Sequence, residues 1–285
     1  MKFYQDQIEF AASQIGYIDS GEKGVFLDTV NTENQIEAKI FHNGGMAGVF
    51  YSCVIFGGLR MHISFETDTG EFNEDLAICV QSALKKADMA SCSIWIFNED
   101  KKIIRFLKER FRIAPEGAHD YASIEYIMRR ERFDRTADQS VLKIRSYEED
   151  HIDDYLILLD GSMTFVDPPP NFLGGKGHWL QCFAERANDN SFEAFWKRDR
   201  LVGLYWRKNA EIDILAVGME HQRKGYGSII LTRAIDMVFK NTDADFAYLY
   251  AVNWNVKGQS FFQKYGMVQN GHSYLLKIYN YDDGR

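Results

Sequence analysis

Short apolar runs and amphipathic stretches follow one another along the second half of the chain. Residues 212–217 are apolar apart from Asp213, and residues 246–252 form an unbroken apolar and aromatic run. Runs of this length predict strands, and the second is too continuous for a half-exposed strand, which indicates the interior of a covered sheet. Apolar residues at helical spacing lie between them, at Ile230, Ala234, Met237 and Val238. The pattern therefore predicts a strand, a loop, an amphipathic helix and a second strand.

The flanking pattern predicts further elements of the same unit. We expect strands at 141–145, 192–196, 201–206 and 274–281, and a helix at 150–159. Turn-forming residues at 198–200 and 208–209 separate the strands at 192–196, 201–206 and 212–217, which then form an antiparallel meander. The expected fold class is α/β, with a mixed sheet.

The loop between the first strand and the helix has the residues of an anion-binding site. Gly225 and Gly227 lack side chains that would hold a ligand away from the backbone, and Arg223 and Lys224 add positive charge. A helix N-terminus carries unpaired N–H groups and partial positive charge, which suit a pyrophosphate. A Gly-x-Gly pair before a helix is also typical of a simple tight turn, so the loop alone leaves both interpretations open.

Two motifs in this region resemble those of a known family. Residues 222–227, Gln-Arg-Lys-Gly-Tyr-Gly, are similar to the Gln/Arg-x-x-Gly-x-Gly/Ala acyl-CoA motif of the GNAT N-acetyltransferase superfamily. Residues 255–266, with the pattern Asn-x-x-Gly-x-x-Phe-x-x-Lys-x-Gly, resemble the second motif of that family. The resemblance covers residues 141–281, and the two motifs stand in the family's order.

The resemblance implies an acetyl-CoA site. In the family, the strand before the loop and the strand after the helix splay apart, and the pantetheine arm lies in the gap. Pantetheine contacts are then implied for the backbone of Leu215, Ala216, Val217 and Met219. Pyrophosphate contacts are implied for Gln222, Arg223, Lys224, Gly225, Tyr226, Gly227 and Ser228, and further cofactor contacts for Asn255 and Phe262.

The first half of the chain resembles a degenerate copy of the second. Residues 93–97, 98–102 and 106–108 match the strand and the Asn-led helix of the second half at one offset, 253 − 98 = 155. We therefore expect two tandem GNAT-like domains, residues 1–136 and 137–285, each with a mostly antiparallel twisted sheet flanked by helices. The linker is expected near 129–140. Two unrelated α/β domains with a chance match are the alternative.

The copied loop in the first half has lost the features that suit phosphate. The offset places Gly70 on Gly225, but Phe72 takes the place of the second glycine, and Asp68 and Glu71 bring acidic charge. A benzyl group blocks close approach to the backbone, and like charge repels phosphate. We expect this half to be structural or to shape the substrate site.

Amine acetylation would need a base. A primary amine of pKa about 10.4 is almost wholly protonated at pH 7, and freeing its lone pair costs about 4.6 kcal/mol. A general base, direct or through water, is therefore expected. Glu211 opens the strand before the loop, where several family members carry a catalytic glutamate, and Asp213 follows on the same strand face. The alternative for each is a solvated carboxylate at the sheet edge.

The position of the general acid holds a different residue here than in many family members. Many relatives place a tyrosine in the Asn-led helix to protonate the departing thiolate, and Phe262 stands at that position here. Tyr265 could replace it if the helix presents the hydroxyl to the cleft, and otherwise packs. A thiolate of pKa about 8.5 is a tolerable leaving group, so water could also serve.

Acceptor recognition is expected from residues 160–190, which combine the stiff Pro168-Pro169-Pro170 run with a glycine-rich stretch before a helix near His178. A lid, an acceptor-pocket wall and an ordinary surface loop are all compatible with this composition. His178 and Cys182 would share a helix face, but two residues do not make a metal site.

Three functions stay open at this point. The first is an acetyl-CoA-dependent N-acetyltransferase acting on a primary amine of a small molecule or peptide. The second is a non-catalytic acyl-CoA-binding or regulatory protein, which the missing tyrosine favours. The third is acylation of another kind of acceptor, because the cleft does not determine its chemistry.

Composition limits the kinds of partner and the cellular location that we expect. A net charge of −8 disfavours nucleic acid. No stretch near 20 apolar residues and no apolar leader is present, so we expect no membrane span and a cytoplasmic protein. The four cysteines lack Cys-x-x-Cys spacing, so reduced core thiols are expected rather than a metal site. We expect a monomer or a homodimer.

Overall fold

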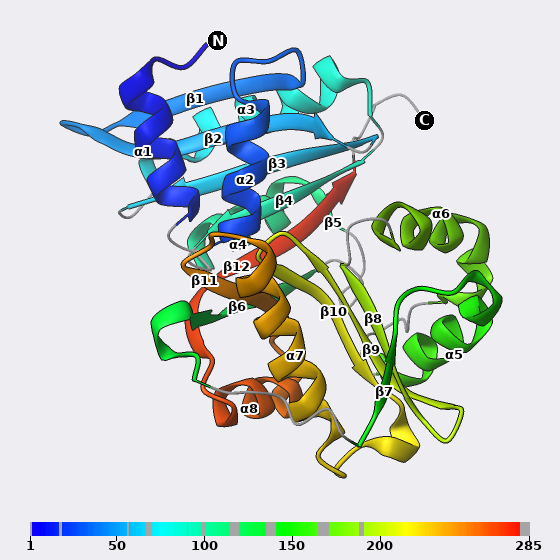
Figure 1. The fold of residues 1–285 in the computed structure, drawn as a ribbon. Coiled ribbons are helices and arrows are strands. Elements are labelled where there is room, and N and C mark those ends of the chain that lie inside the picture. The colour runs from blue at the N-terminus through cyan, green and yellow to red at the C-terminus, as the bar shows by residue number, and fades with distance from the viewer. Residues whose placement is uncertain are drawn as a thin grey trace. The chain divides into compact units, whose positions relative to one another are not determined.

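The computed structural model describes residues 2–16, 19–55, 57–66, 70–89, 91–97, 101–113, 120–134, 141–164, 171–187 and 191–279. The chain forms two compact units: the first contains residues 1–125 and 270–285, and the second contains residues 126–269. Each combines helices with a mixed, mostly antiparallel sheet, as the sequence predicts (Figure 1). The division differs from the expected domains 1–136 and 137–285 at both ends of the second unit.

The first unit contains most of the elements of the first half. They are α1 (Gln5–Gly16), α2 (Ser20–Thr29), β1 (Gln35–His42), β2 (Met46–Ile55), β3 (Gly58–Phe65), α3 (Asn73–Ala87), β4 (Ser91–Phe97), α4 (Lys101–Arg110) and β5 (Arg112–Ile113). Strands β1, β2 and β3 are antiparallel, and β3 pairs in parallel with β4. Alternate residues face opposite layers: Phe50 packs in the cluster with α3 and α4, and Tyr51 in the cluster with α1 and α2.

The last strand of the chain joins the first unit. Strand β12 (Val268–Tyr279) pairs with β4 in antiparallel register from Ser273 to Tyr279, and with β5 at Ile278 and Tyr279. The sequence predicts this strand at 274–281 but assigns it to the second domain, and that assignment is wrong. Apolar alternation shows that a segment is a strand, but it does not identify the strand with which it pairs.

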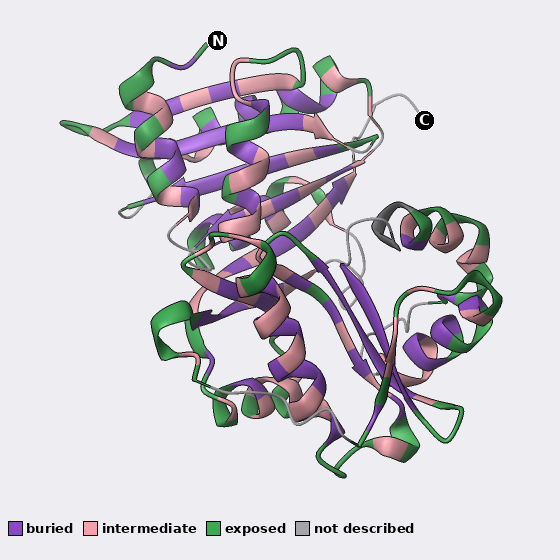
Figure 2. Ribbon diagram, viewed as in Figure 1, coloured by how far each residue is buried: buried purple, intermediate pink, exposed green. Residues whose placement is uncertain are grey.

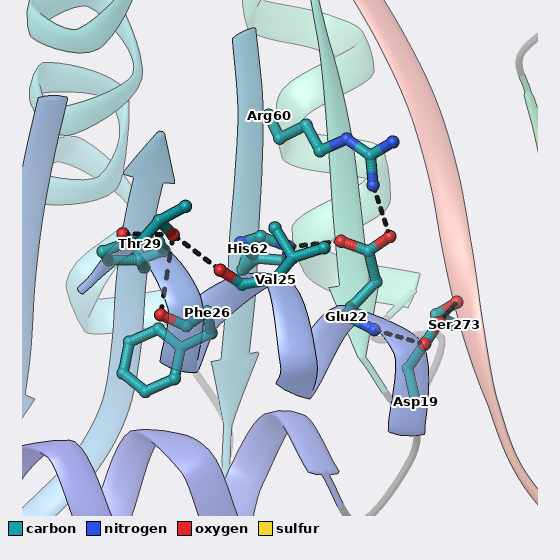
Figure 3. A network of polar contacts seen from close by, with 9 residues as sticks. Asp19, Glu22, Val25, Phe26, Thr29, Arg60, His62 and Ser273 are labelled. Carbon is teal, nitrogen blue, oxygen red and sulfur yellow. Dashed lines mark hydrogen bonds and ion pairs between the residues drawn. The ribbon is translucent and has the colours of Figure 1, made fainter. Parts of the chain in front are cut away.

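A buried polar network attaches α2 to β3 (Figure 3). Glu22 of α2 accepts hydrogen bonds from Arg60 Nη1 at 2.7 Å and lies 2.6 Å from His62 Nε2. His62 is fully buried, stacked on Tyr51 with ring centroids 5.9 Å apart, and Glu22 is 8% exposed. Asp19 caps α2 by accepting from the Glu22 backbone N–H at 2.9 Å. Carboxylates and cations are rarely this buried unless they are paired.

The second unit contains the elements that the motifs predict. They are β7 (Lys143–Arg145), α5 (Ile152–Ser162), α6 (Lys176–Ala187), β8 (Phe192–Lys197), β9 (Arg200–Lys208), β10 (Glu211–Val217), α7 (Tyr226–Asn241), β11 (Phe246–Val252) and α8 (Val256–Lys264). Strand β6 (Asp120–Arg129) leads into the unit from the first. The sheet order is β7-β8-β9-β10-β11, and α5 and α6 lie on the face opposite α7 (Figure 1). Buried residues follow β8, β9 and β10, and exposed residues follow the outer sides of the helices (Figure 2).

The repeat has a structural counterpart. The offset of 155 carries β4, residues 91–97, onto residues 246–252, which are the bounds of β11. It carries α4, residues 101–110, onto 256–265, and α8 spans 256–264. The two units therefore share one order of elements around the corresponding loop.

The cysteines of the first unit are core residues. Cys53, Cys79 and Cys92 are buried free thiols, and burial raises the pKa of Cys79 to about 11. Within the described ranges, no helix is long and apolar enough to cross a membrane.

One residue of the expected linker is firmly held in the second unit. Arg130 donates from its guanidinium to the carbonyls of Phe239, Thr242 and Ala244 at 2.9, 2.7 and 3.0 Å. Its backbone N–H donates to the Asp245 carbonyl at 2.8 Å. The carbonyls at a helix C-terminus lack intrahelical partners and carry partial negative charge, so this guanidinium completes the end of α7. Residues 135–140 of the expected linker lie outside the described ranges.

Arg130→Met is expected to destabilise the C-terminal end of α7 by about 1 kcal/mol, because it removes a cation and three hydrogen bonds from exposed carbonyls. Native-state hydrogen exchange of the last α7 amides measures the effect. Arg130→Lys should recover part of it, since one ammonium cannot reach three spread acceptors as a planar guanidinium does. Arg132→Met, at an exposed neighbouring position, is the control. Equal exchange in both methionine variants would contradict the capping role.

Candidate functional site

Strands β10 and β11 separate beyond one point of contact. They are parallel and share a single registered pair, Glu211 with Tyr248, at the N-terminal end of β10. On its other side β10 stays paired with β9 along its length, up to Val217 opposite Gly203. Backbone groups of a strand need hydrogen-bond partners, and residues 214–217 of β10 have no registered partner in β11. The splay implied by the resemblance is therefore present.

Helix α7 begins at the wide end of this splay without a side-chain cap. Its N-cap is Gly225, with φ of +84°, which has no side chain to accept a hydrogen bond from the N–H groups of the first turn. Arg223 also has positive φ, +60°. Glycine adopts this conformation without strain, which explains the first glycine of the motif. The first turn therefore offers unpaired N–H groups and a positive partial charge.

Several loop residues predicted to bind the cofactor brace the loop itself. Gln222 Nε2 donates to the Val217 carbonyl at 3.1 Å, and Lys224 Nζ donates to the Glu220 carbonyl at 2.6 Å. Ser228 Oγ donates to the Gly225 carbonyl at 2.7 Å. These contacts give the loop a defined shape and leave the first-turn amides uncovered.

The second motif glycine stands where two elements meet. A Cβ on Gly227 would lie 3.3 Å from the Phe261 ring of α8 and 3.7 Å from Val217 Cγ2 of β10. Helix α8 is itself fixed by Asn255, whose Oδ1 accepts from the Gly258 N–H at 3.0 Å. Gly227 thus keeps open the space between the end of β10 and α8. Phe261 was not among the predicted contacts.

Phe262 and Tyr265 have different surroundings. Phe262 is buried, with its ring 5.9 Å from that of Tyr126, so it points into the core of the unit. Tyr265 is half-buried, and its ring lies 4.9 Å from Phe261, the residue beside Gly227. Tyr265 therefore shares the face of α8 that borders the loop. The cofactor contact of Phe262 and the acid role of Tyr265 stay predictions.

One of the two candidate bases lies in a β-bulge of β10. Glu211 is half-buried at the single contact of β10 with β11, and Asp213 is exposed. The register of β10 on β9 shifts between Ile212 and Ile214, so Asp213 is the bulged residue. Bulges re-aim side chains and are frequent beside active sites. Leu215 and Val217 are half-buried, whereas Ala216 is buried in the cluster with α5.

A cavity of about 460 Å³ opens at the C-terminal end of β10, on the face that carries α5. Its apolar lining includes Ile157 and Met219, which are 56% and 63% exposed, and Trp196. Charged side chains also line it: Asp154, Asp199, Glu220 and Arg200. Three carboxylates against one guanidinium give the lining a net negative charge, which suits a cation with apolar parts.

The expected acceptor segment is described only in part. Residues 165–170, which hold the three prolines, and residues 188–190 lie outside the described ranges. The helix predicted near His178 is α6, which begins at Lys176. Asp160 of α5 accepts hydrogen bonds from the backbone N–H groups of Phe172 and Leu173 at 2.6 and 3.2 Å. These two residues are therefore held to α5. His178 Nε2 lies 3.5 Å from Cys182 Sγ, on one helix face as expected.

The corresponding loop region of the first unit is closed. Strands β3 and β4, the counterparts of β10 and β11, pair from Leu59 with Cys92 to Ile63 with Ile96. Phe72, in place of the second glycine, packs its ring 5.3 Å from Phe41. Asp68 lies outside the described residues. Because β3 and β4 do not splay apart, their facing backbone groups pair with each other and are not available to pantetheine.

Comparison with known proteins agrees with this geometry. A sequence model of the acetyltransferase (GNAT) family matches residues 172–267, within the second unit. Spermidine N(1)-acetyltransferase of Vibrio cholerae is 28% identical over 133 residues, covering 39% of this chain and 76% of that protein.

Solved structures share the whole fold. A GCN5-related N-acetyltransferase from Sphaerobacter thermophilus has a TM-score of 0.60 at 12% identity, covering 95% of this chain and 90% of that one. A tandem GNAT protein from the clavulanic acid biosynthesis pathway has a TM-score of 0.52 at 10% identity, covering 85% and 82%. The splayed strands and the uncapped helix thus lie in the region that matches the acetyltransferase (GNAT) family, and the chain has the fold of a tandem of two GNAT-like units.

Proposed function

We propose that the second unit transfers an acetyl group from acetyl-CoA to a primary amine. The observation that carries the proposal is the single registered pair of β10 and β11 beside the uncapped start of α7. This combination offers an unpaired strand edge for the amides of pantetheine and helix amides for the pyrophosphate. Acetyl-CoA would supply the acyl group as an activated thioester.

Each part of the chemistry has a proposed residue. The amine nitrogen attacks the thioester carbonyl, so a C–N bond forms as the C–S bond breaks. Glu211, at the narrow end of the splay, takes the proton of the amine directly or through water, and Asp213 is the second candidate. Tyr265 or water protonates the thiolate. Phe262 has no proton to give.

A cationic acceptor is supported by two independent observations. The cavity at the end of β10 carries Asp154, Asp199 and Glu220 beside apolar side chains. The curated relative is named for spermidine, an amine that is a polycation at neutral pH. We therefore propose that the acceptor is a small amine with more than one positive charge, bound at this cavity.

Thiol release from acetyl-CoA tests the proposal. The expected result is release that depends on an amine with several positive charges, first a polyamine and then an aminoglycoside, and weak or no release with amino acids and peptides. Binding of CoA by calorimetry without acceptor-dependent release across this panel would instead favour the non-catalytic acyl-CoA-binding function. The first unit, whose β3–β4 edge is paired, is proposed to be structural or substrate-shaping.

Gly227→Val tests the cofactor site itself. The new side chain would enter the space between Val217 and Phe261, so CoA affinity should fall about 100-fold, which corresponds to losing about 3 kcal/mol of charged hydrogen bonds. Gly177→Val is the matched control: Gly177 is likewise the second residue of its helix, and nothing lies within 4 Å of its Cβ position. Unchanged CoA affinity in Gly227→Val, with both variants folded by circular dichroism, would contradict the placement of the pyrophosphate.

A further inference from the structure

One cation beside the start of α7 comes from a distant part of the second unit. Lys197 is the last residue of β8, and its Nζ donates a hydrogen bond to Tyr226 Oη at 2.5 Å. The same ammonium lies 5.1 Å from the centroid of the Tyr226 ring. Tyr226 is the first residue of α7 and is buried. The ammonium is thus held against the side chain of the first residue of α7.

A second contact shows that this placement follows from the packing of α7 on β8. Arg233 of α7 donates to the two carboxylate oxygens of Glu193 at 2.8 and 2.6 Å, and this hydrogen bonding raises the pKa of the guanidinium. Glu193 and Lys197 share a strand face about 13 Å apart, and Tyr226 and Arg233 are about 10.5 Å apart along the helix. The later strand residue contacts the earlier helix residue, so the two elements run antiparallel, and β8 places Lys197 beside the first residue of α7.

Lys197 is exposed, and its ammonium has no countercharge close to it among the residues that the structure describes. No ion pair joins it to a carboxylate within the described part of the protein, and Glu193 is already engaged by Arg233. A cation is unfavourable beside the partly positive N-terminus of a helix unless an anion lies between them. The Tyr226 hydroxyl accepts one of the three ammonium N–H bonds, which leaves two for a ligand.

We propose that Lys197 binds the pyrophosphate of acyl-CoA together with the first-turn amides of α7. The β8–β9 hairpin is then part of the cofactor site, and Tyr226 acts as a positioning residue that aims the ammonium. This inference rests on the acyl-CoA site proposed above. It assigns a role to Lys197 that neither loop motif contains.

Calorimetric titration of Lys197→Met with CoA and with 3′-dephospho-CoA tests the assignment. Removing one charged hydrogen-bonding partner should weaken both ligands by the same factor, about tenfold. The salt dependence of binding should also become shallower, because one cation fewer faces the phosphates. Lys197→Arg should keep most of the affinity. Lys240→Met is the control, since Lys240 stands at the other end of α7 and pairs with Asp236.

The outcomes separate this inference from the proposed function. If the wild-type protein binds neither nucleotide, the acyl-CoA site fails and Lys197 loses its ligand. If the wild type binds both and Lys197→Met binds them equally well, only the role of Lys197 is overturned. A loss restricted to CoA would place Lys197 at the ribose 3′-phosphate and overturn its assignment to the pyrophosphate.

Discussion

Glu211→Gln is expected to lower kcat/KM for the amine about 10²- to 10⁴-fold at pH 7, the usual contribution of a positioned general base. The amide has the shape of the carboxylate but cannot take a proton. Without a base, only the small fraction of acceptor that is already deprotonated reacts. The rate should then rise about tenfold per pH unit toward the amine pKa of about 10.4.

Steady-state kinetics from pH 6 to 10 measure this change. Asp213→Asn is the matched variant, because Asp213 lies two residues away on the same strand and is exposed at the bulge. A loss below tenfold is expected there. A pH profile of Glu211→Gln that equals the wild-type profile would remove Glu211 from the mechanism, and a large loss in Asp213→Asn alone would exchange the two roles.

Glu22→Ala is expected to destabilise the first unit by about 3 kcal/mol, at the lower end for removing one partner of a buried ion pair. His62 is fully buried and would lose the carboxylate at 2.6 Å, whereas the Arg60 side chain is 27% exposed and can turn toward water. His62 Nδ1 already has no hydrogen-bond partner within the described residues, so the imidazole would be left without any.

Hydrogen exchange of the α2 and β3 amides is the suitable measurement, because two units need not unfold in one transition. Glu22→Gln, which keeps the shape and a hydrogen bond, should lose less. Glu109→Ala, which breaks the exposed pair with Arg105 on α4, should leave protection unchanged. Equal protection in Glu22→Ala and Glu109→Ala would show that the network does not stabilise α2.

Local pattern was sufficient for the elements around the loop. The apolar run at 246–252 has the bounds of β11, although only alternate residues, Ala247, Leu249 and Ala251, are buried. The loop glycines were singled out because they leave the backbone open to a ligand, and the structure adds two further reasons: Gly225 has positive φ and Gly227 faces Phe261 at close range. Features that depend on spacing of a few residues are visible in one sequence.

Features that depend on contacts between distant segments could not be predicted from the sequence. Strand alternation places Lys197 on the face of β8 with Glu193, but only the packing of α7 brings its ammonium to Tyr226. Arg130 reads as part of a polar linker, yet it binds the last carbonyls of α7. The cavity combines side chains from α5, the β8–β9 turn and the end of β10, which no periodicity connects.

The pairing of β12 with β4 governs the order in which the polypeptide can mature during synthesis. A ribosome completes residues 126–269 before it reaches the segment that closes the edge of β4. The second unit can therefore finish folding while the first still exposes an unpaired edge and part of its apolar layer. Such an edge is a site of aberrant association in a nascent protein, so the first unit is protected only after the second has been made.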